Sequence, residues 1–287
     1  FAAAASGVME KMGVYRLLLV FTVLLPITPA LTTWGIVLAL LAVGSIVVGT
    51  FTALRQVDGM RLLAFSTIGQ MGYVWLGVGI GVALLPVNAS VAALALIAGL
   101  FHAINHAAFK SLLFYNAGAA QYRTGTTDLD RAGGLMQIMP YTAGAAIVAS
   151  LAIGAIPGLN GFASKWMIAQ GALLGGAGMP VLIFFGLISI FVAAVTLAYI
   201  LKFTGILFLG EPNIGEDVEE REVPGPMLVA QYIPAALCVL FGVAPMLVVS
   251  RLHGAVNTVM PEPIALGELF GVHGTVMNLE ALQGAAG

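Results

Sequence analysis

The amino-acid sequence predicts an all-α polytopic membrane protein with about seven transmembrane helices, one of them broken. Of its residues, 60% are hydrophobic and only 8% are charged. Several apolar runs reach the roughly 20 residues that a helix needs to cross a bilayer. None shows the short alternation of apolar and polar residues that is typical of a transmembrane β-barrel. The lipid bilayer is therefore the expected surrounding of the chain.

The apolar runs give seven candidate spans. They cover residues 2–25, 34–54, 61–84, 88–120, 140–175, 180–209 and 227–250. We expect them to form one transmembrane domain over residues 1–250. The segment 251–287 is more mixed in composition and includes Pro261 and Pro263. We interpret it as an interfacial or partner-facing tail.

The span 140–175 is too long for one straight helix, and Pro157 and Gly158 interrupt it. Proline removes a backbone donor and clashes with the preceding turn, so we interpret the span as one discontinuous helix. Backbone groups freed at membrane depth must be satisfied by protein or by a wet cavity. The alternative is a short turn outside the membrane between two half-spans.

Loop charges favour a single crossing by this long span. The loops after the second and fourth spans carry Arg55, Arg61, Arg123 and Arg131, whereas those after the first, third and fifth spans carry no charge. Lys and Arg favour the cytoplasmic side, so the loops alternate correctly only if 140–175 crosses once. The loop at 210–226 should then be cytoplasmic too. It is mainly acidic, and acidic residues carry little topological weight.

Composition also narrows the classes of protein and of site. The single cysteine, Cys238, excludes disulfides and any Cys-based zinc or iron–sulfur site within this chain. There is no basic patch or tail, so we expect no nucleic-acid partner. The chain begins with Phe1 in residues that already have a helical pattern. We therefore expect it to be part of a longer subunit.

Two charged residues lie together in the first span, Glu10 and Lys11. A charge at the centre of a spanning helix costs about 2.5–3.5 kcal/mol on insertion scales. Adjacent residues on a helix do not face each other, so Glu10 is not a simple neutralising partner for Lys11. We predict a functional role for Lys11 and treat Glu10 as an accessory candidate. The alternative is that both extend to the membrane interface.

The fourth span carries His102, His106 and Lys110 at positions i, i+4 and i+8. They form a stripe about 12 Å long on one helix face. Histidine titrates near neutral pH, and burial makes a lysine easier to deprotonate, so the stripe suits stepwise proton transfer. A histidine pair at this spacing also suits a metal, but no Glu, Asp or Cys lies near in sequence, and we predict no metal site.

Lys165 follows directly on the break at Pro157 and Gly158. An ionisable residue beside a broken helix is typical of transporter sites. We expect the stripe to face Lys11 on one side and Lys165 on the other, forming a polar axis at mid-membrane depth. Lys202, near the end of the sixth span, is either an exit-side member of this axis or a residue that snorkels to the interface.

Four segments in this order resemble the antiporter-like subunits of respiratory complex I, Mrp cation/proton antiporters and membrane-bound group 4 hydrogenases. They are SGVMEKMGVY (6–15), RLLAFSTIGQMGY (61–73), FHAINHAAFKSLLF (101–114) and PGLNGFASKW (157–166). The resemblance extends over about residues 6–250. Segments 139–143 and 105–111 look most similar to hydrogenase or formate hydrogenlyase subunits.

The resemblance implies a fold and a set of roles. Residues 1–25 would be the last helix of a first inverted repeat, 34–209 a complete five-helix second repeat, and 227–250 a peripheral helix. Lys11 would link two half-channels. His102, His106 and Lys110 would form the central relay, and Lys165 would be the terminal ionisable residue of the broken helix.

Two positions depart from the family pattern. Met60 stands where members usually have a lysine, which puts the cytoplasmic proton entry in doubt, and Glu10 beside the linking lysine is unusual.

The resemblance implies a proton- or sodium-translocating subunit of a multi-subunit respiratory-type redox complex, in a prokaryotic cytoplasmic membrane. Its partners would be other membrane and peripheral subunits. The chain would hold no cofactor and do no redox chemistry of its own, so iron–sulfur, flavin or nickel–iron centres are expected only in those partners. One alternative is a stand-alone or Mrp-type cation/proton antiporter subunit. Another is a structural membrane anchor that has lost transport, which the departure at Met60 keeps open.

Overall fold

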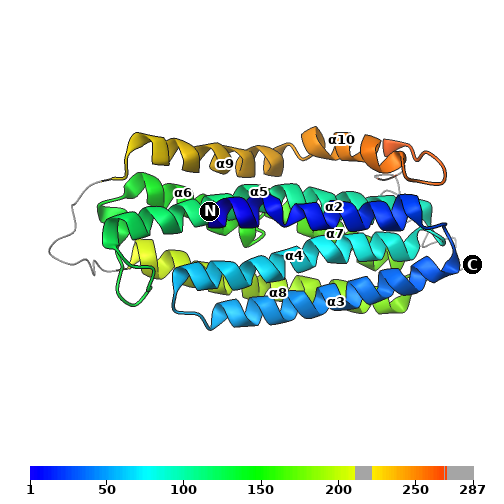
Figure 1. Cartoon of the computed structure of the whole chain (residues 1–287), viewed down its shortest axis with the longest axis horizontal. Helices are drawn as coiled ribbons and strands as arrows, with labels where there is room; N and C mark the ends of the chain where they lie inside the picture. Colours follow the sequence, from blue (N-terminus) through cyan, green and yellow to red (C-terminus); the bar gives the residue numbers. More distant parts are fainter. Residues whose placement is uncertain (211–221, 268, 270–287) are drawn as a thin grey trace, which may run out of the picture.

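The computed structural model describes residues 1–210, 222–267 and 269 as an elongated bundle of helices that lie side by side (Figure 1). The main α-helices are α2 (Lys11–Leu19), α3 (Pro29–Leu54), α4 (Gly59–Leu84), α5 (Ala89–Thr124), α6 (Pro140–Ile153), α7 (Asn160–Gly175), α8 (Pro180–Thr204), α9 (Gly225–Val243) and α10 (Met246–Asn257). The short α1 (Ala2–Ala4), the π-helical turns η1 (Ala5–Met9), η2 (Val20–Leu24) and η4 (Gly205–Leu209), and the 3₁₀ turn η3 (Leu135–Gln137) complete the elements. Within the described residues, the β-structure is a single bridge between Asp58 and Asp128.

Five helices of the described chain are long and apolar enough to cross a membrane: α3, α4, α5, α8 continued by η4, and α9. The N-terminal helical run from α1 to η2 and the pair α6–α7 account for the other two predicted crossings. The prediction of an all-helical membrane fold with a broken helix is confirmed.

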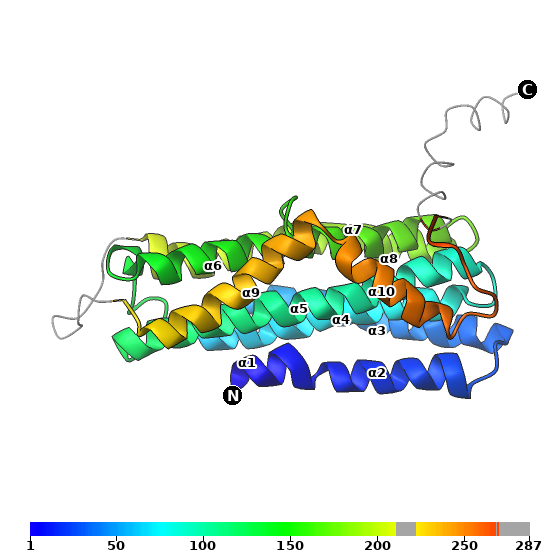
Figure 2. The same cartoon turned by 90° about the horizontal axis from the view of Figure 1, so that it is seen from above.

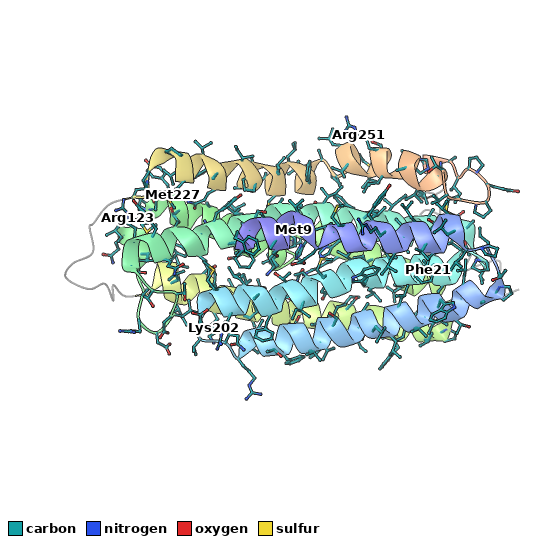
Figure 3. The ribbon with its side chains drawn as sticks, viewed as in Figure 1. Met9, Phe21, Arg123, Lys202, Met227 and Arg251 are labelled. Atoms are coloured by element: carbon teal, nitrogen blue, oxygen red, sulfur yellow. The ribbon has the colours of Figure 1, made fainter. Side chains whose placement is uncertain are left out.

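Successive crossings of the bundle alternate in direction, with α6 and α7 together making one crossing, so the connections between crossings gather at two ends (Figure 1). The α3–α4 and α5–α6 connections lie at one end, where α8 also ends and α9 begins. Figure 3 labels Arg123 and Lys202 at this end. The α2–α3, α4–α5 and α7–α8 connections lie at the other end. The two loops that carry arginine therefore lie at the same end of the bundle, as the prediction that residues 140–175 cross once requires.

Small residues bring the central helices close together. A Cβ atom on Gly49 of α3 would lie 2.4 Å from the backbone nitrogen of Gly69 on α4. Such backbone contact is typical of helix packing in membranes, where small residues replace the hydrophobic driving force. Helix α5 lies within this packing and is buried along most of its length, so any polar residue on it must find a partner inside the protein.

The predicted discontinuous helix consists of α6 and α7, which follow each other along the bundle (Figure 2). Pro157 and Gly158 lie in the connection between them. Gly158 has a φ of 89°, which glycine adopts freely, and Ala155 has a φ of 60°, which is uncommon for a residue with a Cβ atom. The chain thus turns sharply between the two half-helices.

The structure differs from the predicted spans near the C-terminus. The span expected at 227–250 is divided, because α9 ends at Val243 and α10 begins at Met246 after Pro245. The two helices meet at an angle beside the connection between α6 and α7 (Figure 2), where a Cβ atom on Gly242 of α9 would lie 2.4 Å from the carbonyl oxygen of Gly158. The segment predicted as a tail from residue 251 onward is helical as far as Asn257. Residues 211–221 of the acidic loop, residue 268 and residues 270–287 of the tail lie outside the described part of the chain.

Candidate functional site

Lys11 is the first residue of α2, and Glu10 alone separates it from the π-helical turn η1. Its ammonium donates to the main-chain carbonyl of Ser6 within that turn and lies 2.7 Å from Nδ1 of His106 on α5. Gly7 packs against α5 in the same turn, where a Cβ atom would lie 2.3 Å from Oγ of Ser111. The irregular turn therefore brings a lysine into direct contact with an imidazole of the neighbouring helix.

The predicted stripe on α5 is wholly inside the protein: His102, His106 and Lys110 are all fully buried. Nδ1 of His102 lies 2.9 Å from Oγ of Ser164 on α7. Nε2 of His102 and Nε2 of His106 are buried and hydrogen-bond to no described residue. Phe109 packs against both rings, with centroid distances of 6.0 Å and 5.5 Å. Each histidine thus reaches one neighbouring helix through Nδ1, and its second ring nitrogen stays free.

Lys165 is held where α6 ends. Its ammonium donates to the carbonyl of Ile153, the last residue of α6, at 2.9 Å. The final carbonyls of a helix lack intrahelical partners and carry its negative partial charge, so this end of α6 stabilises a cation. The ammonium also lies 4.7 Å from the ring centroid of Tyr73 on α4. Lys165 is 6% exposed, so these neutral groups replace most of its water.

Lys110 points toward α4 rather than toward either of the other two lysines. It donates to the carbonyl of Leu63 at 2.9 Å and to the hydroxyl of Ser66. It therefore lies beside the row as a third lysine that is also held by neutral oxygens. Phe114 covers it, with a centroid 5.9 Å from the ammonium.

These side chains form a row that crosses from α2 through α5 to α7. It consists of Lys11, His106, His102 and Ser164, and Lys165 follows Ser164 in the sequence. Figure 2 shows these three helices in that order across the bundle. Met9, two residues before Lys11, lies near the middle of the bundle's length (Figure 3). The structure thus places Lys11 and Lys165 on opposite sides of the α5 stripe, as expected. The role of the row as a proton relay stays a prediction.

Helix α4 supplies a wall of the site that sequence reasoning missed. Ser66 contacts Lys110, Thr67 lies 2.9 Å from the Ser6 hydroxyl, and Tyr73 contacts Lys165. Gln70 is fully buried on the same helix. These four residues recur at i, i+1, i+4 and i+7, which is one face of a helix. That polar face within an apolar span is the sequence signal that points to this wall.

The remaining candidates lie outside the row. Glu10 is half-buried, and its Oε2 atom is buried with no hydrogen-bond partner among the described residues. Lys202 donates to the carbonyls of Leu54 at 3.3 Å and Gln56 at 2.7 Å, so it caps the end of α3. Within the described residues, no group of three or more His, Cys, Asp or Glu is placed to hold a metal ion.

Comparison with known proteins gives a consistent set of relatives. The transmembrane family described as NADH:quinone oxidoreductase/Mrp antiporter matches residues 2–193. Hydrogenase-4 component B of Escherichia coli K12 is 37% identical over 93% of this chain and 41% of its own length. Formate hydrogenlyase subunit 3 of the same organism is 35% identical over 92% of this chain and 45% of its own length. The chain thus spans less than half the length of these two relatives.

Solved structures share the fold. The archaeal membrane-bound sulfane sulfur reductase, a respiratory membrane complex, contains a chain with a TM-score of 0.77 and 35% identity. The match covers 91% of this chain and 41% of that one. Respiratory complex I from Thermus thermophilus contains a chain with a TM-score of 0.71 and 24% identity, covering 88% of this chain and 51% of that one. At that identity, the second match concerns the fold alone.

Proposed function

This chain belongs to the NADH:quinone oxidoreductase/Mrp antiporter transmembrane family, and we propose on this premise that it forms part of an ion-translocating membrane subunit. Protons are the proposed substrate, with sodium ions as the second candidate. The path is the row from Lys11 through His106 and His102 to Lys165, with Lys110 beside it. The 2.7 Å contact between Lys11 and His106 carries the proposal, because it places two titratable groups within hydrogen-bond distance inside a membrane bundle.

The chemistry of the row supports a change of protonation state. The direct partners of the three lysines are carbonyls, hydroxyls, an aromatic ring and an imidazole, all of which are neutral, and the negative charge of Glu10 acts on Lys11 and Lys110 only from a distance. A carboxylate partner would fix the ammonium as a permanent ion pair, whereas neutral partners allow the lysine to lose and regain its proton. Ionisable groups inside a membrane bundle are costly and mark ion pathways or proton relays.

The names of the relatives support a place within a larger redox complex. They include a hydrogenase component, one of the subunits of formate hydrogenlyase and a chain of an archaeal respiratory complex. We therefore place the chain among other membrane and peripheral subunits, in the cytoplasmic membrane of a prokaryote. Any iron–sulfur, flavin or nickel–iron centre would belong to those partners. Electron transfer there would change the charge state of the row and drive ions across the membrane.

A second candidate function has its own support. One component of the Na(+)/H(+) antiporter of Alkalihalophilus pseudofirmus is 33% identical over 93% of this chain and 34% of its own length. A cation/proton antiporter would use the same row without redox partners. Mass spectrometry of the intact complex separates the two functions, since redox subunits that co-purify support the first and their absence supports the second.

The test of translocation uses proteoliposomes that contain the intact complex and a trapped pH-sensitive dye, and the complex's own electron donor energises them. Wild-type complex should move protons, and Lys110→Ala should reduce movement to the background. Lys202→Ala is the matched control and should keep most of the activity, since Lys202 caps α3 away from the row. Movement of ²²Na⁺ without protons would make sodium the substrate. Unchanged movement in Lys110→Ala would contradict the proposed role of this lysine.

A further inference from the structure

Tyr73 stands between two members of the row that come from different helices. Its ring centroid lies 4.7 Å from the Lys165 ammonium on α7 and 5.6 Å from the His102 ring centroid on α5. We propose that Tyr73 is a positioning residue for Lys165. The ring of Tyr73 holds the charged ammonium of Lys165 over its face, between the end of α6 and His102. The inference rests on the proposed function, because its consequence is the rate of ion translocation.

The ring of Tyr73 is fixed from two helices. Its backbone belongs to α4, and its hydroxyl donates to the carbonyl of Ser189 on α8 at 2.7 Å. The residue is 1% exposed. Because the ring is attached to α4 and hydrogen-bonded to α8, its orientation is fixed. The packing of α4 against α8 therefore sets the position of the ammonium above the ring.

An aromatic face has a property that suits this position. Its quadrupole attracts a cation, and the attraction strengthens when the cation has lost its water. Lys165 has lost most of its water, and the Ile153 carbonyl takes only one of its three donors. The ring supports the charged form without accepting a proton. A carboxylate at the same place would compete with the row for that proton, whereas Tyr73 leaves it available.

A cavity of about 210 Å³ beside Lys165 explains why positioning is needed. Tyr73, Lys165, Trp166 and Ser189 are among the residues that line it. Trp166 is 48% exposed, so the cavity opens toward the outside of the bundle between α7 and α8. Without the ring, the flexible lysine can swing into this space and away from His102. The ring therefore keeps Lys165 at the inner wall of the cavity, next to the row.

The experiment grades the strength of the ring–cation contact without changing its shape. The intact complex is prepared with Tyr73→Phe and with phenylalanine analogues that carry one, two or three fluorines at position 73. Fluorine withdraws electron density from the ring face and weakens the attraction step by step. Tyr73→Phe should keep translocation within about threefold of wild type, each fluorine should lower it further, and Tyr73→Leu should lower it by about tenfold or more.

The control is the same fluorinated series at Phe203, a fully buried ring on α8 that packs against Gly59 and has no cation over it among the described residues. That series should leave translocation unchanged. Should Tyr73→Leu fail to assemble, the fluorinated series still decides, because its members match phenylalanine closely in shape. If the wild-type complex translocates ions and the fluorinated variants at position 73 all translocate at the same rate, the inference is overturned. A wild type that moves no ions would instead contradict the proposed function.

Discussion

The lysines at the two ends of the row both donate to the main chain, but the backbone that accepts has a different conformation at each end. Lys11 and Lys165 both donate to a main-chain carbonyl, that of Ser6 at one end and that of Ile153 at the other. Ser6 lies in a π-helical turn, and Ile153 is the last residue of a half-helix. Irregular backbone at membrane depth is tolerated where protein satisfies it, and here an ammonium does so. Each break in regular structure thus creates the acceptor for a buried cation.

The two ends differ in what lies on the other side of the lysine. Lys11 is only partly buried and directly contacts the His106 imidazole, so two titratable groups lie within hydrogen-bond distance of each other. Lys165 is almost fully buried, and it contacts a carbonyl and an aromatic ring, while the neighbouring Ser164 reaches His102. Under the proposed function, we infer that the α2 end serves proton exchange with α5 and that the α7 end holds its lysine in place.

The largest expected effect is that of Lys165→Ala. This variant should reduce ion translocation by about 100-fold or more, because a relay fails when a titratable step is missing. The complex should still assemble, since removing a buried charge lowers the cost of insertion. Proteoliposome assays and the subunit composition of the purified complex measure the two properties. Normal translocation would contradict the role of Lys165, and loss of assembly would support the structural-anchor alternative.

Gly161→Ala tests the backbone of the α7 end. A Cβ atom at this position would lie 1.9 Å from the carbonyl oxygen of Ala152, so α6 and α7 must move apart. Backbone cannot rotate away as a side chain can, and we expect a loss of stability of about 1–3 kcal/mol. Translocation should fall about tenfold, because Ile153 moves away from Lys165. The thermal inactivation temperature of the purified complex and the proteoliposome assay check both effects.

Gly118→Ala is the matched control for Gly161→Ala. Gly118 lies on α5, and a Cβ atom there would meet no atom within 4 Å. Alanine also favours a helix over glycine by about 1 kcal/mol, so this variant should be as stable as wild type or slightly more stable. Equal losses in the two variants would show that the helix break has no special need for Gly161.

The sequence singled out the ionisable residues that the structure brings together, because charge in an apolar span is conspicuous. Lys11, His102, His106 and Lys165 stood out without any knowledge of the fold. The polar face of α4 did not, since Ser66 and Tyr73 are residue types that also make ordinary helix–helix hydrogen bonds. Only the folded bundle shows that they meet Lys110 and Lys165. Charge is therefore conspicuous in a sequence, whereas the neutral groups that support it leave only a weaker signal, a polar face within an apolar span.

The helix breaks were predictable to different degrees. Pro157 and Gly158 correctly indicated the break between α6 and α7. Pro245 is a similar signal between α9 and α10, since the residue before a proline is disfavoured in a helix, but the predicted span ran through it. The π-helical turn η1 has no such signal, because it contains neither a proline nor an unusual run of residues. It forms where Gly7 packs against α5.

Lys202→Ala sharpens the contrast between the lysines of the row and a lysine that serves structure. Lys202 donates to the carbonyl of Leu54, the last residue of α3, which carries the negative end of the helix dipole, and to that of Gln56 just beyond the helix. Losing this cap should lower stability by about 0.3–1 kcal/mol while translocation continues. A small decrease in the thermal inactivation temperature, with ion movement near the wild-type rate, is the expected result. A complete loss of translocation would instead make Lys202 a member of the path.

A small effect is also expected from Gly7→Ala at the α2 end. A Cβ atom there would lie 2.3 Å from Oγ of Ser111, but this atom is the tip of a side chain that can rotate. Its hydrogen bond to the Ala3 carbonyl is long, at 3.5 Å, and its loss costs little. We expect a loss of stability below about 1 kcal/mol. The double variant Gly7→Ala/Ser111→Ala should recover it, because the nearest remaining atoms, the Ala107 carbonyl oxygen and Cβ of residue 111, lie at 3.6 Å and 3.7 Å. If Gly7→Ala proves as damaging as Gly161→Ala and the double variant gives no recovery, the α2 end is as rigid as the α7 end. The contrast between an end built for exchange and an end built to hold a charge would then be wrong.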